Sequence, residues 1–107
     1  MFFGKSVFKM YVKSDCPYCD KAREIILRDL KSSLLLVDVT DQPDLREMVI
    51  RDTGGHKTVP AIYIGDKFIG GCDDLCELVE SREIEKRILI VENCILREEI
   101  MRLRRSL

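Results

Sequence analysis

The sequence predicts an α/β fold in which helices flank a small mixed four-stranded sheet, followed by a C-terminal helical extension. Short apolar runs alternate with segments whose apolar residues recur at helical spacing, and Gly65-Asp66 joins two later runs as a hairpin turn. A strand–helix–strand start implies parallel strands with a right-handed crossover, whereas a hairpin adds antiparallel neighbours. The order strand, helix, strand, helix, strand, strand, helix therefore predicts a mixed sheet.

The first strand–helix pair is expected at residues 6–12 and about 17–30. Residues 6–12 are apolar and rich in β-branched and aromatic side chains, which is typical of a strand. Pro17 suits the first helical position because its φ is fixed and the missing N–H needs no partner there. The side chains expected on the inner helical face are Ala22, Ile25, Ile26 and Leu30.

The second pair begins with the near-continuous apolar run at residues 34–39, which is typical of a strand buried on both faces. Thr40 and Asp41 are expected to cap the following helix, which has Pro43 in its first turn. Gly54-Gly55 is expected to end this helix. Its inward side chains are predicted to be Leu45, Met48 and Val49.

Two short strands and a third helix complete the predicted domain, which spans residues 1–82. The strands are expected at 60–64 and 67–69, and the helix at 73–81. Gly70-Gly71 interrupts the pattern between the last strand and this helix. The inward side chains of the helix are predicted to be Leu75, Leu78 and Val79.

Residues 83–107 form a charged, helix-prone extension with a wide apolar face. Such a face should pack on something, so we expect the extension either to cap the domain's own core or to serve as a dimerisation or docking helix. Removing 84–107 is expected to leave the thiol chemistry largely intact. Periodicity also leaves a strand at 88–91 open. One apolar series is Ile84, Ile88, Val91 and Ile95, and the other is Leu89, Leu96, Ile100, Leu103 and Leu107.

Composition favours one domain in a reducing compartment. The 107 residues, 46% of them hydrophobic, suffice for one compact core. A formal net charge of -1 gives no general attraction to nucleic acid or anionic membranes. No apolar run approaches the roughly 18 to 20 residues that span a bilayer, and Met1 to Met10 lacks the features of a signal peptide. We therefore expect a cytoplasmic location.

Two cysteines separated by two residues at a helix start are suited to disulfide chemistry. The chain has five cysteines, an odd number that argues against a secreted disulfide scaffold. Unpaired N–H groups and the helix dipole favour a thiolate at Cys16, Lys13 adds positive charge, and Asp15 opposes with a small screened effect. Cys19, nearly one turn further on, should be more buried, less ionised and able to attack a mixed disulfide on Cys16.

The alternative to redox chemistry is half of a zinc site. A C-x-x-C knuckle usually comes with a second pair of ligands, which Cys72 and Cys76 could supply with help from His56. A knuckle rarely carries Pro-Tyr between its cysteines and rarely starts a helix directly after a strand. We therefore favour redox chemistry and predict no metal site. Cys94 is expected to pack, with an intermolecular disulfide as its alternative.

Three motifs resemble the glutaredoxin family. Cys16-Pro17-Tyr18-Cys19 matches its dithiol motif, Thr58-Val59-Pro60 its T-V-P signature before the third strand, and Gly70-Gly71-Cys72-Asp73-Asp74 its G-G-C-[DS]-D segment. The motifs occur in the family's order, and the resemblance covers about residues 6–82. It implies a thioredoxin-like fold and glutathione as reductant, with no tightly bound cofactor.

The resemblance also implies a role for each matched residue. Cys16 would be the nucleophile and Cys19 the resolving thiol, while the Val59 backbone would pair with the cysteine of bound glutathione beside a cis Pro60. Helix N–H groups at Cys72 and Asp73 would bind the γ-glutamyl carboxylate. The remaining glutathione contacts would be Asp73 or Asp74 for the ammonium, Lys13 and Lys57 for the glycyl carboxylate, and Tyr18 and Thr58 along the groove.

The implied activity is reduction of protein disulfides and glutathione mixed disulfides, with ribonucleotide reductase a family-level candidate substrate. Two alternatives stay open. One is a dimer that holds an iron–sulfur cluster through the first cysteine of each chain and two glutathiones; Pro17 disfavours it, because cluster-binding relatives usually carry Gly or Ser there. The other is a thioredoxin-like reductant served by a flavoprotein, disfavoured by Pro-Tyr between the thiols and by the lack of Trp.

Overall fold

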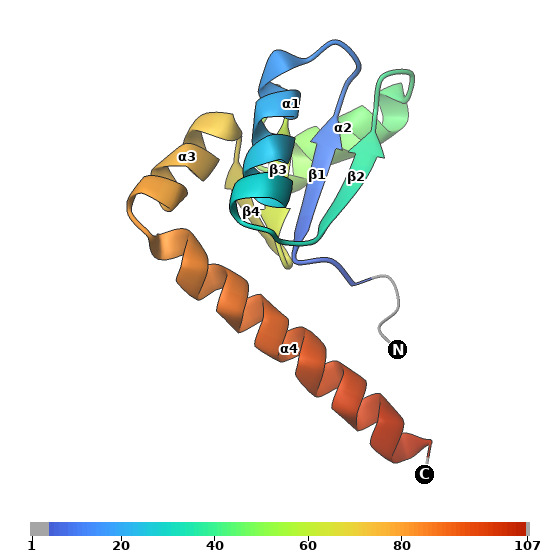
Figure 1. Cartoon of the computed structure of the whole chain (residues 1–107). Coiled ribbons are helices and arrows are strands. Elements are labelled where there is room, and N and C mark those ends of the chain that lie inside the picture. Colours follow the sequence, from blue (N-terminus) through green and yellow to red (C-terminus); the bar gives the residue numbers. More distant parts are fainter. Residues whose placement is uncertain (1–4, 107) are drawn as a thin grey trace.

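The computed structural model describes residues 5–106, whose strands form one mixed sheet in the order β2-β1-β3-β4 (Figure 1). Strand β1 pairs in parallel with β2 and antiparallel with β3, and β3 pairs antiparallel with β4. The predicted mixed sheet is confirmed. The strands are β1 (Phe8–Val12), β2 (Leu34–Asp38), β3 (Ala61–Ile64) and β4 (Lys67–Gly70).

Helices cover both faces of this sheet, with α1 and α3 on one face and α2 on the other (Figure 1). The expected first helix begins at Pro17 but ends in one π-helical segment, η1, in which the Leu30 N–H donates to the Ile25 carbonyl at 2.9 Å. The helices are α1 (Pro17–Glu24), η1 (Ile25–Asp29), α2 (Pro43–Asp52), α3 (Cys72–Glu80) and α4 (Glu83–Arg105).

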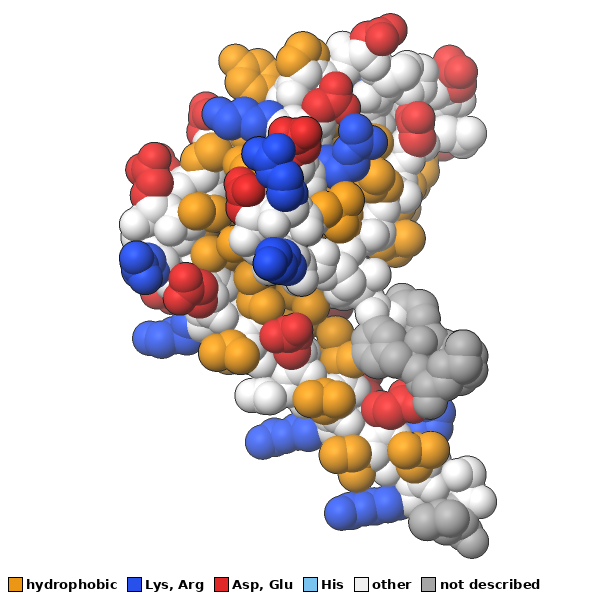
Figure 2. Space-filling model, in the orientation of Figure 1, with side chains coloured by type: hydrophobic (Ala, Val, Ile, Leu, Met, Phe, Trp, Pro, Cys, Tyr) orange, Lys and Arg blue, Asp and Glu red, His pale blue; other side chains and the backbone are white. Residues whose placement is uncertain are grey.

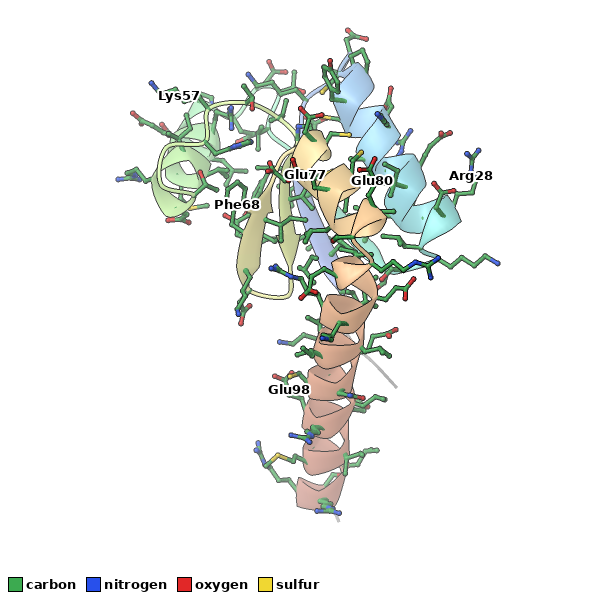
Figure 3. The ribbon with its side chains drawn as sticks, turned by 90° about the vertical axis from the view of Figure 1, so that its left-hand side faces the viewer. Arg28, Lys57, Phe68, Glu77, Glu80 and Glu98 are labelled. Carbon is green, nitrogen blue, oxygen red and sulfur yellow. The ribbon has the colours of Figure 1, made fainter. Side chains whose placement is uncertain are left out.

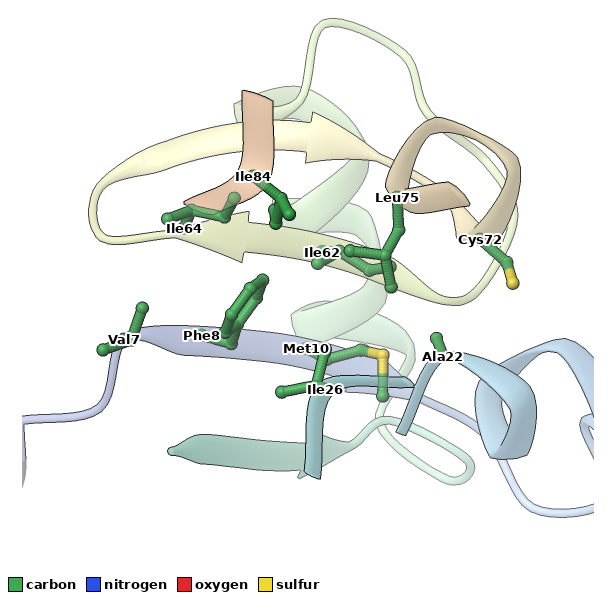
Figure 4. Close-up of a cluster of buried hydrophobic side chains, with 10 residues drawn as sticks. All are labelled: Val7, Phe8, Met10, Ala22, Ile26, Ile62, Ile64, Cys72, Leu75 and Ile84. Atoms are coloured by element: carbon green, nitrogen blue, oxygen red, sulfur yellow. The ribbon is translucent and has the colours of Figure 1, made fainter. Parts of the chain in front are cut away.

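The sheet separates two apolar clusters, and the larger lies under α1 and α3 (Figure 4). Ala22 and Ile26 of α1 are fully buried there, as the helical spacing predicts. Leu75 contributes from α3. The smaller cluster, under α2, consists of Tyr11, Val39, Val49 and Ala61. Because burial of such side chains is worth about 1.5–3 kcal/mol each, the two clusters fix the positions of α1, α2 and α3 around the sheet.

The expectation that residues 34–39 are buried on both faces is wrong. β2 is an edge strand, so it has a hydrogen-bonded neighbour on one side only. Leu35 is 47% exposed and Leu36 is 40% exposed. Successive strand residues point to opposite faces, so neither face of β2 is fully covered.

The start of α2 also differs from the sequence expectation. Its N-cap is Gln42, whose side chain makes no capping hydrogen bond, so Thr40 and Asp41 are not its caps. Val49 is buried as predicted, but Met48 is exposed. The predicted end is confirmed: the Gly55 N–H donates to the Ile50 carbonyl at 2.8 Å.

Helix α4 includes residues 88–91, so the alternative of a strand there is wrong. The two apolar series of α4 lie in different surroundings. Ile84 is fully buried, and Ile88, Val91 and Ile95 pack against the larger cluster. Gly65, at the β3–β4 turn with φ +59°, packs closely on α4, since a Cβ there would lie 3.0 Å from a Val91 methyl group. The first half of α4 therefore belongs to the core. That deletion of 84–107 leaves the thiol chemistry largely intact stays a prediction.

The described members of the second apolar series, Leu89, Leu96, Ile100 and Leu103, are exposed, and the helix projects away from the sheet (Figures 1 and 2). Residues 1–4, at the start of the predicted 1–82 domain, and Leu107, the last member of the second series, lie outside the described part. Within residues 5–106, no helix combines the length and apolar character needed to cross a bilayer.

Candidate active site

The candidate nucleophile lies where α1 begins. After β1 ends at Val12, a short loop leads to Cys16, whose backbone is extended and which serves as the N-cap of α1. The Cys19 N–H donates to Cys16 Sγ at 3.2 Å. Pro17 occupies the first turn of α1. Backbone N–H groups there have no partner within the helix, so the missing N–H of proline costs nothing. Cys16 is half-buried, so its sulfur stays accessible while one helix N–H group points at it.

Cys19 differs sharply from Cys16 because it is only 3% exposed. Burial, followed by a hydrogen bond to the Cys16 side chain, raises the pKa of Cys19 to about 12, and a hydrogen bond with the Lys13 backbone opposes the rise. Cys19 is therefore a neutral thiol near pH 7. The expectation that Cys19 is the more buried of the two cysteines is confirmed.

The loop before β3 brings a second motif against the thiols. The Cys16 thiol donates to the Val59 carbonyl at 3.8 Å, and the Val59-Pro60 peptide bond is cis. Pro60 is fully buried. A group bonded to Cys16 Sγ would therefore lie beside the backbone of Val59.

The start of α3 closes the third side of the site. Gly71 lies against the same loop, since a Cβ there would sit 3.6 Å from the Pro60 carbonyl oxygen. The Gly71 N–H donates to Asp74 Oδ2 at 2.9 Å, so the Asp74 carboxylate caps the helix. Asp73 is exposed in the same turn. Of the two candidate partners for an ammonium group, Asp73 is therefore the one whose carboxylate is not used by the cap.

Cys72 places its backbone in this turn while its side chain is buried in the larger apolar cluster. Burial, together with the neighbouring Cys76 thiol, raises the pKa of Cys72. The thiol is therefore neutral and covered, and Cys72 can offer only its backbone N–H to a ligand. Cys76 is half-buried and Cys94 is exposed.

The remaining predicted contacts are on the surface around this centre. Tyr18 is 63% exposed, and Lys13, Lys57 and Thr58 are exposed as well. Lys57 lies in the loop after α2, on the α2 side of the molecule (Figure 3). Its carbonyl accepts a hydrogen bond from the Arg46 guanidinium of α2. The structure thus brings Cys16, the Val59-Pro60 segment and the first turn of α3 together. Lys57 lies at the periphery of this site.

Thr40 is a positioning residue that the sequence reasoning assigned to a helix cap. Its hydroxyl oxygen accepts from the Ser14 N–H at 2.9 Å and its hydroxyl donates to Asp38. The hydrogen bond from the Thr40 hydroxyl, with a further one from the Thr40 N–H, lowers the pKa of Asp38. β1 and β2 are parallel neighbours, so their carboxyl ends lie at the same edge of the sheet. This placement could have indicated from the sequence that Ser14, after β1, and Thr40, after β2, lie close together.

His56 is a second residue with an unexpected place. Its Nε2 lies 3.3 Å from the Pro60 carbonyl oxygen and 3.3 Å from Thr58 Oγ1, and its ring packs edge-on against Phe68 at 5.1 Å. The ring therefore holds the loop that faces Cys16. Among residues 5–106, no three or more His, Cys, Asp or Glu side chains are grouped so that they could hold a metal ion.

Comparison with known proteins identifies similar chains. A family model described as Glutaredoxin matches residues 8–69. Glutaredoxin-1 of Homo sapiens is 38% identical over 89 residues, covering 79% of this chain and 82% of that protein. Glutaredoxin-1 of Oryctolagus cuniculus is 37% identical with the same coverage. The holo form of glutaredoxin C1 from Populus tremula x tremuloides superposes with a TM-score of 0.73 at 27% identity, covering 80% of this chain and 86% of that one.

Proposed function

The chain belongs to the glutaredoxin family, and from this premise we propose that Cys16 and Cys19 carry its glutathione-dependent thiol–disulfide oxidoreductase activity. The observation that carries this proposal is the difference between the two sulfurs. Cys16 Sγ is accessible and receives a helix N–H, whereas Cys19 is buried and protonated. One thiolate that attacks and one thiol held in reserve are what sequential disulfide exchange requires.

In the first route, Cys16 acts alone on a glutathione mixed disulfide. Its thiolate attacks the glutathione sulfur, the protein thiolate leaves and takes a proton from solvent, and Cys16 becomes glutathionylated. A second glutathione, as thiolate, attacks the glutathione sulfur of this intermediate. The products are glutathione disulfide and the regenerated Cys16 thiolate. The Val59 backbone, which is close to Cys16 Sγ, supports this placement of the mixed disulfide.

In the second route, Cys16 attacks a protein disulfide and Cys19 resolves the mixed disulfide that forms. The hydrogen bond and the charge of Cys16 are two of the causes that raise the pKa of Cys19. Both disappear once Cys16 Sγ is bonded to a substrate sulfur. Cys19 therefore ionises more readily at the stage at which it must attack, and two glutathiones then reduce the internal disulfide.

Glutathione itself would bind across the three segments that meet at Cys16. Its cysteine would pair with the Val59 backbone, and its γ-glutamyl carboxylate would accept from the Cys72 and Asp73 N–H groups at the start of α3. Asp73 is the stronger candidate for the ammonium, because Asp74 already accepts from Gly71. The peripheral contacts would come from Lys13, Tyr18, Lys57 and Thr58.

The test is reduction of a glutathione mixed disulfide, coupled to glutathione reductase and followed by NADPH consumption. Wild type should be active, Cys16→Ser should be inactive, and Cys19→Ser should keep much of the rate. With a protein disulfide as substrate, Cys19→Ser should lose most activity. A Cys16→Ser variant that retains activity would refute the assignment of the nucleophile.

The natural substrates we propose are disulfide-bonded or glutathionylated proteins, with ribonucleotide reductase as one candidate. We also propose a cytoplasmic or equally reducing location, which the odd number of cysteines supports. Homodimerisation through the C-terminal helix is also proposed. The unpartnered apolar side chains of α4 support it.

A further inference from the structure

We propose that α4 pairs with the α4 of a second copy as a parallel two-stranded coiled coil. Leu89, Leu96 and Leu103 recur at intervals of seven residues and are 60%, 58% and 54% exposed. Ile100, also exposed, lies four residues after Leu96 and three before Leu103. This is the spacing of the second apolar position in a heptad repeat. Leu89, Leu96, Ile100 and Leu103 thus form an apolar seam along about four turns of helix.

This seam lies on a different face of α4 from the one that packs on the domain. Ile84, Ile88, Val91 and Ile95 point into the larger cluster. At about 100° per residue, their mean direction differs from that of Leu89 and Leu96 by more than a quarter turn. A second helix can therefore occupy the seam while the contacts of α4 with its own domain remain.

Asn93 occupies the seam position between Leu89 and Leu96. It is exposed, and among residues 5–106 no partner is found for its side-chain amide. A single Asn at this heptad position pairs with its counterpart across a two-stranded coiled coil and fixes the register at some cost in stability. A partner of different sequence would not supply this matching amide at the same height, which favours a second copy as the occupant.

The charges beside the seam select the parallel orientation. In a parallel pair, Glu92 faces Arg97 of the second copy, and Glu99 faces Arg104 of the second copy, five residues further on. In an antiparallel pair, Glu would face Glu and Arg would face Arg. Glu99 already pairs with Arg102 of its own helix, so Glu92–Arg97 is the clearer contact. Exposed ion pairs contribute little to affinity, so their effect here is to favour the parallel orientation over the antiparallel one.

Cys94 falls one position after Asn93, on the outer side of the seam. The pairing therefore keeps the two Cys94 thiols apart and disfavours the intermolecular disulfide considered from the sequence. Both thiol sites would lie at the same end of the dimer, because both domains precede α4 in the chain. The pairing does not depend on the proposed redox function.

The first test is sedimentation equilibrium of the full reduced chain from about 10 to 500 μM, a range chosen for the weak affinity of a seam of about two heptads. We expect a monomer–dimer equilibrium. Leu96→Ala and Leu103→Ala should each weaken it at least about tenfold, since each removes two buried leucines per dimer. Met101→Ala, exposed but off the seam, should leave it unchanged. A monomer throughout, or a dimer indifferent to Leu96→Ala, would overturn the proposal.

The second test reports orientation. In a Cys94→Ser background, Asn93→Cys and Met101→Cys are equilibrated with reduced and oxidised glutathione and run on a non-reducing gel. In a parallel pair the two residue-93 thiols meet, so a disulfide forms while one glutathione disulfide becomes two glutathiones. Residue 101 points outward and should not cross-link. Equal cross-linking of both variants, or none at 93, would contradict the parallel arrangement. Circular dichroism and the thiol assay check that each variant is folded.

Discussion

Thr40 Oγ1 lies 2.9 Å from the backbone nitrogen of Ser14, so the loops that follow β2 and β1 are joined directly before the candidate nucleophile. The same hydroxyl donates to Asp38 at the end of β2. Ser14 is two residues before Cys16 in the chain. The entry angle of α1, and with it the direction of Cys16 Sγ, therefore depends on a residue far away in the sequence.

Thr40→Ala should lower kcat/KM for a glutathione mixed disulfide by about threefold to tenfold, because small displacements of a reacting group are costly. The steady-state assay with glutathione reductase measures this. Thr40→Ser keeps the hydroxyl and should stay close to wild type. If the alanine variant matches wild type, the hydrogen bonds to Ser14 do not orient the site.

The same contacts predict how stability depends on pH. The hydrogen bonds from Thr40 lower the pKa of Asp38 below its usual 3.8 in the folded state. A depressed folded-state pKa contributes stability that is present above the unfolded pKa and is lost as the pH falls through the folded value. Asp38→Asn should therefore be less stable than wild type near pH 7, and the gap should close below about pH 3.8. Urea unfolding at several pH values measures it; a gap that widens in acid would contradict the assignment.

Asp73 and Asp74 are neighbours with separable roles. Asp74→Ala removes the acceptor for the Gly71 N–H and should cost about 1 kcal/mol of unfolding free energy. Asp73→Asn should leave stability unchanged and raise the KM for glutathione, because it removes the proposed partner of the ammonium. Thermal melts and a glutathione titration on both variants distinguish the two effects. Reversed results would exchange the two roles.

Cys19 should resist alkylation in the native protein. Its pKa of about 12 leaves very little thiolate near pH 8, and the rate should rise about tenfold per pH unit above that. Cys16→Ser removes two of the causes that raise the pKa of Cys19, so the Cys19 rate should increase in that variant. Peptide mass spectrometry after timed iodoacetamide pulses measures both, with the exposed Cys94 as the internal reference. Rapid Cys19 labelling in wild type would contradict the buried position.

Ile84→Ala should destabilise the domain by about 2–5 kcal/mol, because this fully buried side chain fills the larger cluster. Met101→Ala, further along the same helix and exposed, is the matched control and should change unfolding by less than about 0.5 kcal/mol. Urea unfolding of both variants measures the difference. Equal stabilities would mean that α4 does not contribute to the core.

Local patterns predicted those parts of the molecule that local chemistry decides. The helix that starts at Pro17, the end of α2 at Gly54-Gly55 and the hairpin at Gly65 each depend on a few adjacent residues. The three segments that meet at Cys16 were implied by motif resemblance. Even so, the different roles of Asp73 and Asp74 depend on the hydrogen bond from the Gly71 N–H to Asp74, which only the folded turn reveals.

The exposure of β2 and the role of Thr40 could not be predicted, because both depend on which strands become neighbours. An apolar run does not reveal whether its strand ends at the edge or the centre of a sheet. Thr40 suits a helix cap by residue type, but the nearby end of β1 offers its hydroxyl another partner. Likewise, the two apolar series of α4 look equivalent until the domain covers one of them.

The open edge of β2 has a consequence for how the protein behaves when it is concentrated. Leu35 and Leu36 stand beside a row of backbone groups with no strand against them, an arrangement that invites strand addition between molecules. Lys31 before the strand and Asp38 at its end place charges that oppose such stacking. We therefore expect removal of the Asp38 charge to favour strand addition between molecules at β2.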